Sequence, residues 1–144
     1  MKHKIKTLLI LLFSFFSFSV IFAQLAMNLN MNSSRYIKHE KIFALLTIKN
    51  QSGIPIVFGD SKQFSATIKL NIQTLNGEIP ETIQSPIFKI NDIILKAGEQ
   101  DNFTIPVSEY YKFNGEGKYK IKVIVSNPQI KNSYQTNFAE FSIV

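Results

Sequence analysis

Cysteine and tryptophan are both absent from this chain of 144 residues. Without cysteine the protein has no disulfide, no thiolate metal site, no cysteine nucleophile and no lipid-modified cysteine anchor. Charged residues make up 18% of the sequence and apolar residues 45%, which is typical of neither a disordered chain nor a coiled coil. The sequence therefore predicts a single globular domain whose core holds together without covalent cross-links.

The N-terminus has the pattern of a secretory signal peptide. Three lysines within residues 1–6 precede a mainly apolar stretch at 8–22, and Ala23 then stands before the polar Gln24. The apolar stretch is shorter than the ~20 residues that span a bilayer. We therefore expect a signal peptide at 1–23 that is cleaved after Ala23, over the alternative of an uncleaved membrane anchor.

Cleavage leaves a moderately charged domain at 24–144, with 13 basic and 10 acidic residues. This balance gives no reason to expect a nucleic-acid partner. A small exported domain without disulfides is more typical of a bacterial envelope than of animal extracellular space. We expect a secreted or periplasmic bacterial protein with no membrane span after cleavage.

Alternation of apolar and polar residues predicts that the mature chain is all β. The clearest alternation runs over residues 64–73, where every second residue is apolar. Seven to nine short strands separated by turns are typical of an antiparallel β-sandwich. Further strands are expected at 25–31, 40–49, 54–58, 102–107, 118–125 and 137–143, with an apolar run at 88–95 and a single helical turn at 108–113.

Two stretches allow more specific predictions. Asn76-Gly77 favours a type I′ hairpin turn, with a return strand at 79–83. Phe43 and Leu45 lie on the second face of a strand whose first face is also apolar, which indicates a strand either covered on both sides or lying mid-sheet.

Short motifs resemble those of immunoglobulin-like domains. The stretch Gly117-Lys-Tyr119-Lys-Ile121 resembles the Gly-x-Tyr-x-Cys that opens the sixth strand of such domains, with Ile121 in place of the Cys. The run at 42–52 resembles their second strand and Asn-x-Ser turn, and 95–99 is similar to their Leu-x-x-Gly-Glu turn. The order of features is also similar to the Bacillus-type intracellular proteinase inhibitor family, although that family is intracellular and this chain has a secretory leader. The resemblance implies an immunoglobulin-like sandwich in which the Tyr119 hydroxyl bonds to backbone just upstream.

Side chains that could support catalysis are scarce in the mature chain. His39 is its one histidine, and the chain contains no Gly-x-Ser-x-Gly stretch that would mark a serine hydrolase. One histidine does not build a three-ligand zinc site, and Asp92, Glu99 and Asp101 match no known calcium loop. The sequence therefore predicts a protein that is not an enzyme and that needs no metal or cofactor.

Lys118, Lys120 and Lys122 are candidates for a binding surface. They point to one side of a predicted strand at intervals of ~6.7 Å, which suits an acidic polymer, a phosphate or an anionic surface. The alternative is a solvated face whose charges discourage aggregation between strands. Cross-strand acids such as Glu140 could also neutralise it.

Aromatic and apolar residues are further candidates. Tyr110, Tyr111 and Phe113 form a cluster that either closes the end of the sandwich or binds a ligand. Phe43 and Leu45 would form an exposed patch suited to a protein partner if nothing covered them.

These observations favour a non-catalytic, exported β-sandwich that acts by binding, with another envelope or secreted protein as its partner, or as a structural module. The alternative is a proteinase inhibitor that presents an exposed loop to a protease. Both follow from the fold and from the scarcity of catalytic groups rather than from a specific site.

The signal peptide leads to a direct prediction. The exported protein should begin at Gln24, because the small Ala23 ends the apolar stretch. Intact mass spectrometry of the exported protein measures this. A mass that includes residues 1–23 would contradict it.

Overall fold

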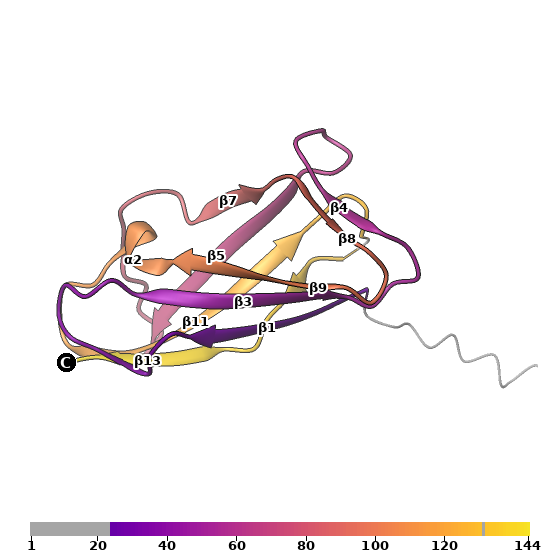
Figure 1. The fold of residues 1–144 in the computed structure, drawn as a ribbon. Helices are drawn as coiled ribbons and strands as arrows, with labels where there is room; N and C mark the ends of the chain where they lie inside the picture. The colour runs from indigo at the N-terminus through magenta and orange to yellow at the C-terminus, as the bar shows by residue number, and fades with distance from the viewer. Residues whose placement is uncertain (1–23, 131) are drawn as a thin grey trace, which may run out of the picture.

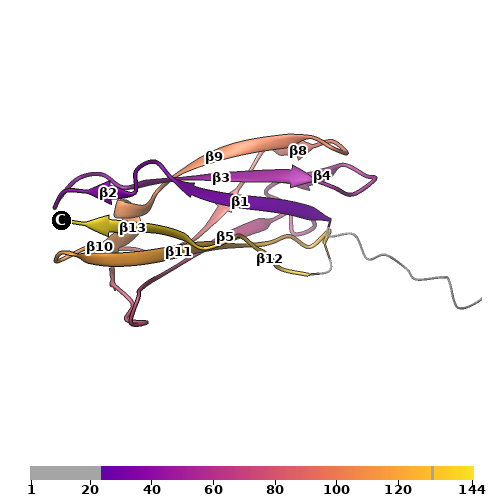
Figure 2. The same cartoon turned by 90° about the horizontal axis from the view of Figure 1, so that it is seen from below.

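The computed structural model describes residues 24–130 and 132–144 as two layers of β-strands packed face to face (Figures 1 and 2). The predicted signal peptide lies outside the described residues. Thirteen strand segments are present in the described part, nine of them with three or more residues, together with the helical turn α2 (Val107–Tyr110). The predicted all-β sandwich is confirmed, and the nine longer strands agree with the seven to nine strands expected.

The two layers have different numbers of strands. The first has the order β1-β3-β9 and is antiparallel throughout. The second has the order β2-β13-β11-β5-β7, with β12 also paired to β11, and only its β2–β13 pair is parallel. The first sheet consists of β1 (Leu25–Met31), β3 (Phe43–Asn50) and β9 (Gln100–Pro106), and the second of β2 (Arg35–Tyr36), β5 (Ala66–Thr74), β7 (Ile87–Ile90), β11 (Gly117–Ser126), β12 (Tyr134–Gln135) and β13 (Ala139–Ile143).

Two short strand pairs complete the fold. β4 (Ile56–Phe58) pairs with β8 (Ile93–Leu95), and β6 (Glu81–Thr82) pairs with β10 (Tyr111–Lys112). The β4–β8 pair lies at one end of the sandwich, whereas α2 and the C-terminus lie at the other (Figure 1). We call the latter the loop end.

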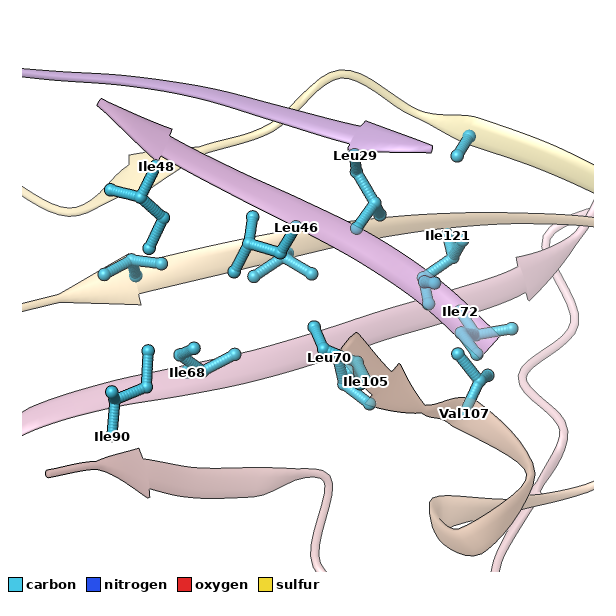
Figure 3. Close-up of a cluster of buried hydrophobic side chains, with 14 of the residues drawn as sticks. Leu29, Leu46, Ile48, Ile68, Leu70, Ile72, Ile90, Ile105, Val107 and Ile121 are labelled. Atoms are coloured by element: carbon cyan, nitrogen blue, oxygen red, sulfur yellow. The ribbon is translucent and has the colours of Figure 1, made fainter. Parts of the chain in front are cut away.

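The core fills the space between the two sheets with aliphatic side chains. Leu46 and Ile48 of β3 face Ile68 and Leu70 of β5, and all four are at most 1% exposed (Figure 3). Alternation along each strand places these residues on one face, and truncation of such side chains to Ala typically costs about 2–5 kcal/mol. The packed aliphatic layer therefore accounts for much of the stability of a domain that has no disulfide.

The position of β3 in its sheet explains why the strand is apolar on both faces. β3 is the middle strand of its sheet. The prediction of a mid-sheet strand is therefore confirmed, and the alternative of a strand covered on both sides is wrong. Leu45 is 40% exposed on the outer face, between Asn30 of β1 and Thr104 of β9. Phe43 is half-buried.

The turn at Asn76-Gly77 differs from the prediction. A type I′ turn needs positive φ at both residues, but only Gly77 has it, with φ +91°. The Thr74 amide donates to the Glu78 carbonyl (2.8 Å), and the Gly77 amide donates to Thr74 (3.0 Å). These bonds describe a three-residue loop with glycine in the left-handed position.

The return strand predicted at 79–83 is also wrong. After Glu78 the chain leaves β5, and pairing with β5 resumes only where the Leu70 amide donates to the Pro86 carbonyl (2.9 Å). Pro80 has no N–H to donate across a ladder, which disfavours continuation of the hairpin. We call the segment between Glu78 and Pro86 the excursion. It contains β6, which pairs with β10.

The apolar run at 88–95 is divided between two strand pairs. β7 ends at Ile90 and pairs with β5, whereas β8 begins at Ile93 and pairs with β4. Asp92 lies between them with φ 62°, a left-handed conformation that Asp tolerates better than most residues. This residue lets the chain change direction between the two pairings.

The Asn50 side chain connects the end of β3 to the turn that follows it and to β8. Its side chain is fully buried and donates to the carbonyls of Ile54 (2.8 Å) and Leu95 (2.9 Å). Its Oδ1 accepts from the amide and the hydroxyl of Ser52 (2.8 and 2.7 Å). The amide thus ties the turn after β3 to the end of β8.

Replacement of Asn50 should destabilise the fold strongly. Asn50→Ala removes the buried bond to the Leu95 carbonyl together with the bonds to Ile54 and Ser52, and it should lower the free energy of unfolding by about 3 kcal/mol. Asn102→Ala is the matched control, because Asn102 is exposed and bonds only to the Thr47 hydroxyl through its side chain (2.8 Å), so it should cost less than about 0.5 kcal/mol. Denaturant unfolding measures both, and equal costs would contradict the role given to Asn50.

Candidate functional site

The outer face of the six-stranded sheet concentrates the basic residues of the domain. Of the 13 basic and 10 acidic residues at 24–144, six basic residues and one acidic residue, Glu140, stand at outward positions of this sheet's strands. We call this surface the cationic face. Its basic residues are Arg35 of β2, Lys69 of β5, Lys89 of β7, and Lys118, Lys120 and Lys122 of β11.

The strand alternation explains why these side chains share one face. In β11 the residues between the lysines are buried in the core, so the lysines point outward. The register places Lys122 beside Asn71 and Ile124 beside Lys69, while Thr67 lies between Ser126 and Lys89. The three predicted lysines are therefore part of a larger surface that extends over β5 and β7.

Phe138 organises the centre of the cationic face. The ammonium groups of Lys120 and Lys122 each lie 5.1 Å from the centroid of its ring. The Lys122 Nζ also donates to the Gln135 Oε1 (2.9 Å). Cation–π contacts at exposed sites contribute about 0.5–1 kcal/mol, so the ring restrains two like charges near each other. Phe138 itself is 45% exposed.

Acidic residues form no ion pair with the basic residues of the cationic face within the described residues. The one ion pair among the described residues joins Lys112 to Glu81 (3.4 Å), which lie at the loop end and not on the cationic face. Glu140 stands directly across from Lys120 in the register, yet the two form no ion pair. Glu140 therefore lies across from Lys120, as the alternative of cross-strand neutralisation required, but without a direct ion pair.

At the Lys118 end of the cationic face, acidic residues lie close to the basic ones. Lys118 borders a hollow of about 400 Å³ that Glu78 and Glu116 also line. These acids reduce the positive potential around Lys118. Lys120, Lys122 and Lys69 do not border this hollow.

The aromatic candidates at 110–113 pack into the protein. Tyr111 is 4% exposed, and its hydroxyl donates to the Leu70 carbonyl (3.1 Å). Burial raises the pKa of the Tyr111 phenol, which keeps it protonated as a donor. Tyr110 stacks on Phe88 with ring centroids 5.3 Å apart, and Phe113 packs edge-on against Tyr119 at 5.0 Å. These contacts help to close the loop end, and Tyr111 and Phe113 also line a hollow of about 340 Å³ there.

Tyr119 lies where the immunoglobulin-like resemblance places its corner tyrosine. It is 7% exposed, and its hydroxyl donates to the Gly115 carbonyl at 3.4 Å. Its ring stacks on Phe141 (5.4 Å) and lies over Gly117, where an added Cβ would sit 3.5 Å from a ring carbon. The hydrogen bond is long, so the packing of the ring contributes more than the hydroxyl.

His39 lies beside a hollow at the loop end. This hollow has a volume of about 340 Å³, and Ile37, Ile83 and Glu109 are among its other lining residues. The Ser108 hydroxyl there accepts a bond from the Ile42 amide (3.2 Å), which engages it in backbone structure. His39, Glu40 and Glu109 line this hollow together with Ser108, and no hydrogen bond joins Ser108 to His39 among the described residues.

Two of the acids considered for calcium accept hydrogen bonds from nearby backbone amides. The Glu99 carboxylate accepts from the Lys96 amide (2.7 Å), and Asp101 accepts from the Asn102 amide (2.8 Å). Over 24–130 and 132–144, no group of three or more metal-ligating side chains comes together. The same residues contain no helix that is long and apolar enough to cross a membrane.

Comparison with known proteins places the fold. The chain matches no protein-family model, and no curated protein matches it in sequence. A crystal structure of a CARDB domain from Pyrococcus furiosus, in complex with di-metal ions, aligns with 85% of this chain and 91% of its own at a TM-score of 0.51 and 16% identity. The DNA glycosylase AlkC of Pseudomonas fluorescens, bound to DNA containing an abasic site analog, aligns with 84% of this chain at a TM-score of 0.52 and 16% identity. This chain spans only 30% of the AlkC chain.

At such identities the likeness shows the fold alone. The CARDB match supports an immunoglobulin-like β-sandwich, as the motif resemblance implied. The metal ions and the DNA are bound by those proteins, and one fold supports many functions.

Two tyrosine hydroxyls allow a comparison of their contributions to stability. Tyr111→Phe should lower the free energy of unfolding by about 1 kcal/mol, because its hydroxyl bond is buried. Tyr119→Phe should cost less, since its bond is longer, whereas Tyr119→Ala should cost about 3 kcal/mol through loss of ring packing. Thermal or denaturant unfolding of the three variants measures this order. A larger cost for Tyr119→Phe than for Tyr111→Phe would contradict it.

Proposed function

We propose that this protein is an exported, non-catalytic binding module whose cationic face holds a negatively charged partner. The observation that carries the proposal is the segregation of charge: six of the 13 basic residues and one of the 10 acidic residues share one sheet face. Charges of one sign on a continuous surface raise the local concentration of oppositely charged partners and steer their approach.

The affinity of such binding comes from the number of ion pairs rather than from any single pair. An exposed ion pair contributes about 0.2–1 kcal/mol, and salt screens it. Lys120 and Lys122 have an advantage, because the Phe138 ring and Gln135 already restrict their side chains and less freedom is lost on binding. We expect binding that is cooperative over the face and sensitive to ionic strength.

The proposal includes the expectation that the protein is not an enzyme. Catalysis of hydrolysis needs an activated nucleophile or a metal-bound water with a base nearby. The Ser108 hydroxyl accepts from the Ile42 amide, and the carboxylates of Glu99 and Asp101 accept from nearby backbone amides, which supports a protein without such a set. We expect no turnover of peptide, ester, glycoside or phosphate substrates.

Proteinase inhibition is the second candidate, and one observation favours it. The excursion after β5 exposes Ile79 (70%) and Ile83 (59%) around the short β6. An exposed loop of this kind is what an inhibitor offers to a protease cleft. The two candidates differ in surface, since inhibition would use the loop end and would not need the cationic face.

Retention on immobilised heparin, a soluble polyanion, tests the leading proposal. The variant Lys120→Gln, Lys122→Gln should bind about tenfold more weakly than the unaltered protein, because it loses two restrained charges. The control Lys49→Gln, Lys96→Gln removes the same net charge from positions outside the cationic face and should lose much less. The salt concentration at elution measures the difference.

Equal weakening of both variants would show that net charge alone determines retention and would contradict the proposal. No loss of retention in either variant would contradict it as well. If the protein inhibits a secreted protease at the same time and Ile79→Ser, Ile83→Ser abolishes that inhibition, the second candidate replaces the first.

A further inference from the structure

The cationic face also exposes apolar side chains among its charges. Phe138 is 45% exposed between Lys120 and Lys122, and Ile87 is 49% exposed at the edge strand β7. Ile87 lies directly across from Lys69 in the register. A partner that offered only negative charge would gain nothing from these apolar side chains.

The opposite outer face has a different chemistry. At the outward positions of β1, β3 and β9, Lys49 is the one charged residue in the described structure, and amide and hydroxyl side chains predominate. Leu45 is the large apolar residue exposed there, at 40%. The molecule therefore has one broad face with both positive charge and apolar groups, and a second, nearly neutral one.

We propose that the cationic face lies on the surface of a bilayer that contains anionic phospholipids. This inference rests on the proposed function and names the partner. Lysines meet the phosphate groups of the lipids, while Phe138 and Ile87 enter the boundary between headgroups and acyl chains. The sheet provides a broad surface for this contact, and the neutral opposite face gives the bound protein one preferred orientation.

The charge and the apolar groups act together. Each lysine near an anionic leaflet strengthens binding about fivefold, and this contribution falls with rising salt. A half-exposed aromatic ring adds a contribution of similar size that salt does not screen. Because Lys120 and Lys122 flank the ring, the charges and the ring reach the headgroup region at the same place.

Sedimentation with lipid vesicles tests the inference. The purified protein should bind vesicles of phosphatidylglycerol mixed with phosphatidylcholine and should not bind vesicles of phosphatidylcholine alone. Lys120→Gln, Lys122→Gln should weaken binding about 25-fold, and Phe138→Ala about fivefold. Leu45→Ala is the matched control for Phe138→Ala, since it removes a similarly exposed apolar side chain from the opposite face. Leu45→Ala should leave vesicle binding unchanged.

The outcomes separate this inference from the proposed function. If the protein binds heparin through Lys120 and Lys122 but does not bind anionic vesicles, the membrane inference is wrong and the proposed function stands, with a soluble polyanion as partner. If it binds neither, both are wrong. Vesicle binding that Phe138→Ala leaves unchanged, with the variant shown to be folded by its thermal unfolding, would contradict the role given to the apolar groups and with it the choice of a bilayer.

Discussion

The packing of aliphatic side chains between the two sheets is the interaction on which the rest of this structure depends. The protein has no disulfide, so Leu46 and Ile48 on one side and Ile68 and Leu70 on the other hold the layers together. Native cores are close-packed, and loss of one such side chain is costly. Each strand must therefore give every second position to the core. The outward positions are left for contact with the surroundings.

The use made of the outward positions differs between the two sheets. In β11 the inward residues are all apolar, and three of the outward ones are lysines. The neighbouring strands add Lys69 and Lys89 to the same surface, whereas the sheet that contains β3 has mainly amide and hydroxyl groups outside. A sandwich with two identical outer faces would have no orientation relative to a surface, but this one does.

The sequence was a good guide to features that depend on local alternation. The strands around 64–73 and 118–125 were predicted because period-two patterns need no knowledge of partners. The lysine stripe of β11 followed from the same pattern. Its extension to Lys69 and Lys89 could not, since it depends on strand order, which joins residues far apart in the sequence.

Errors arose where non-local contacts overrode a local signal. Asn76-Gly77 does reverse the chain, but the excursion that contains Pro80 pairs with β10 and displaces the predicted return strand. Asn50 does form the Asn-x-Ser turn, since its Oδ1 accepts from the Ser52 amide, but its burial and its bond to the Leu95 carbonyl depend on β8. In both cases the decisive partners come from other parts of the chain.

The central claim is that the protein works through the outer face of the six-stranded sheet. Amide chemical shifts recorded by NMR during titration with a short soluble polyphosphate test this residue by residue. The account predicts that the shifts change along β11, β5 and β13, with the largest changes near Lys120 and Lys122, while β1, β3 and β9 remain unaffected. Changes confined to the hollow beside His39 and Ile83 at the loop end would contradict it.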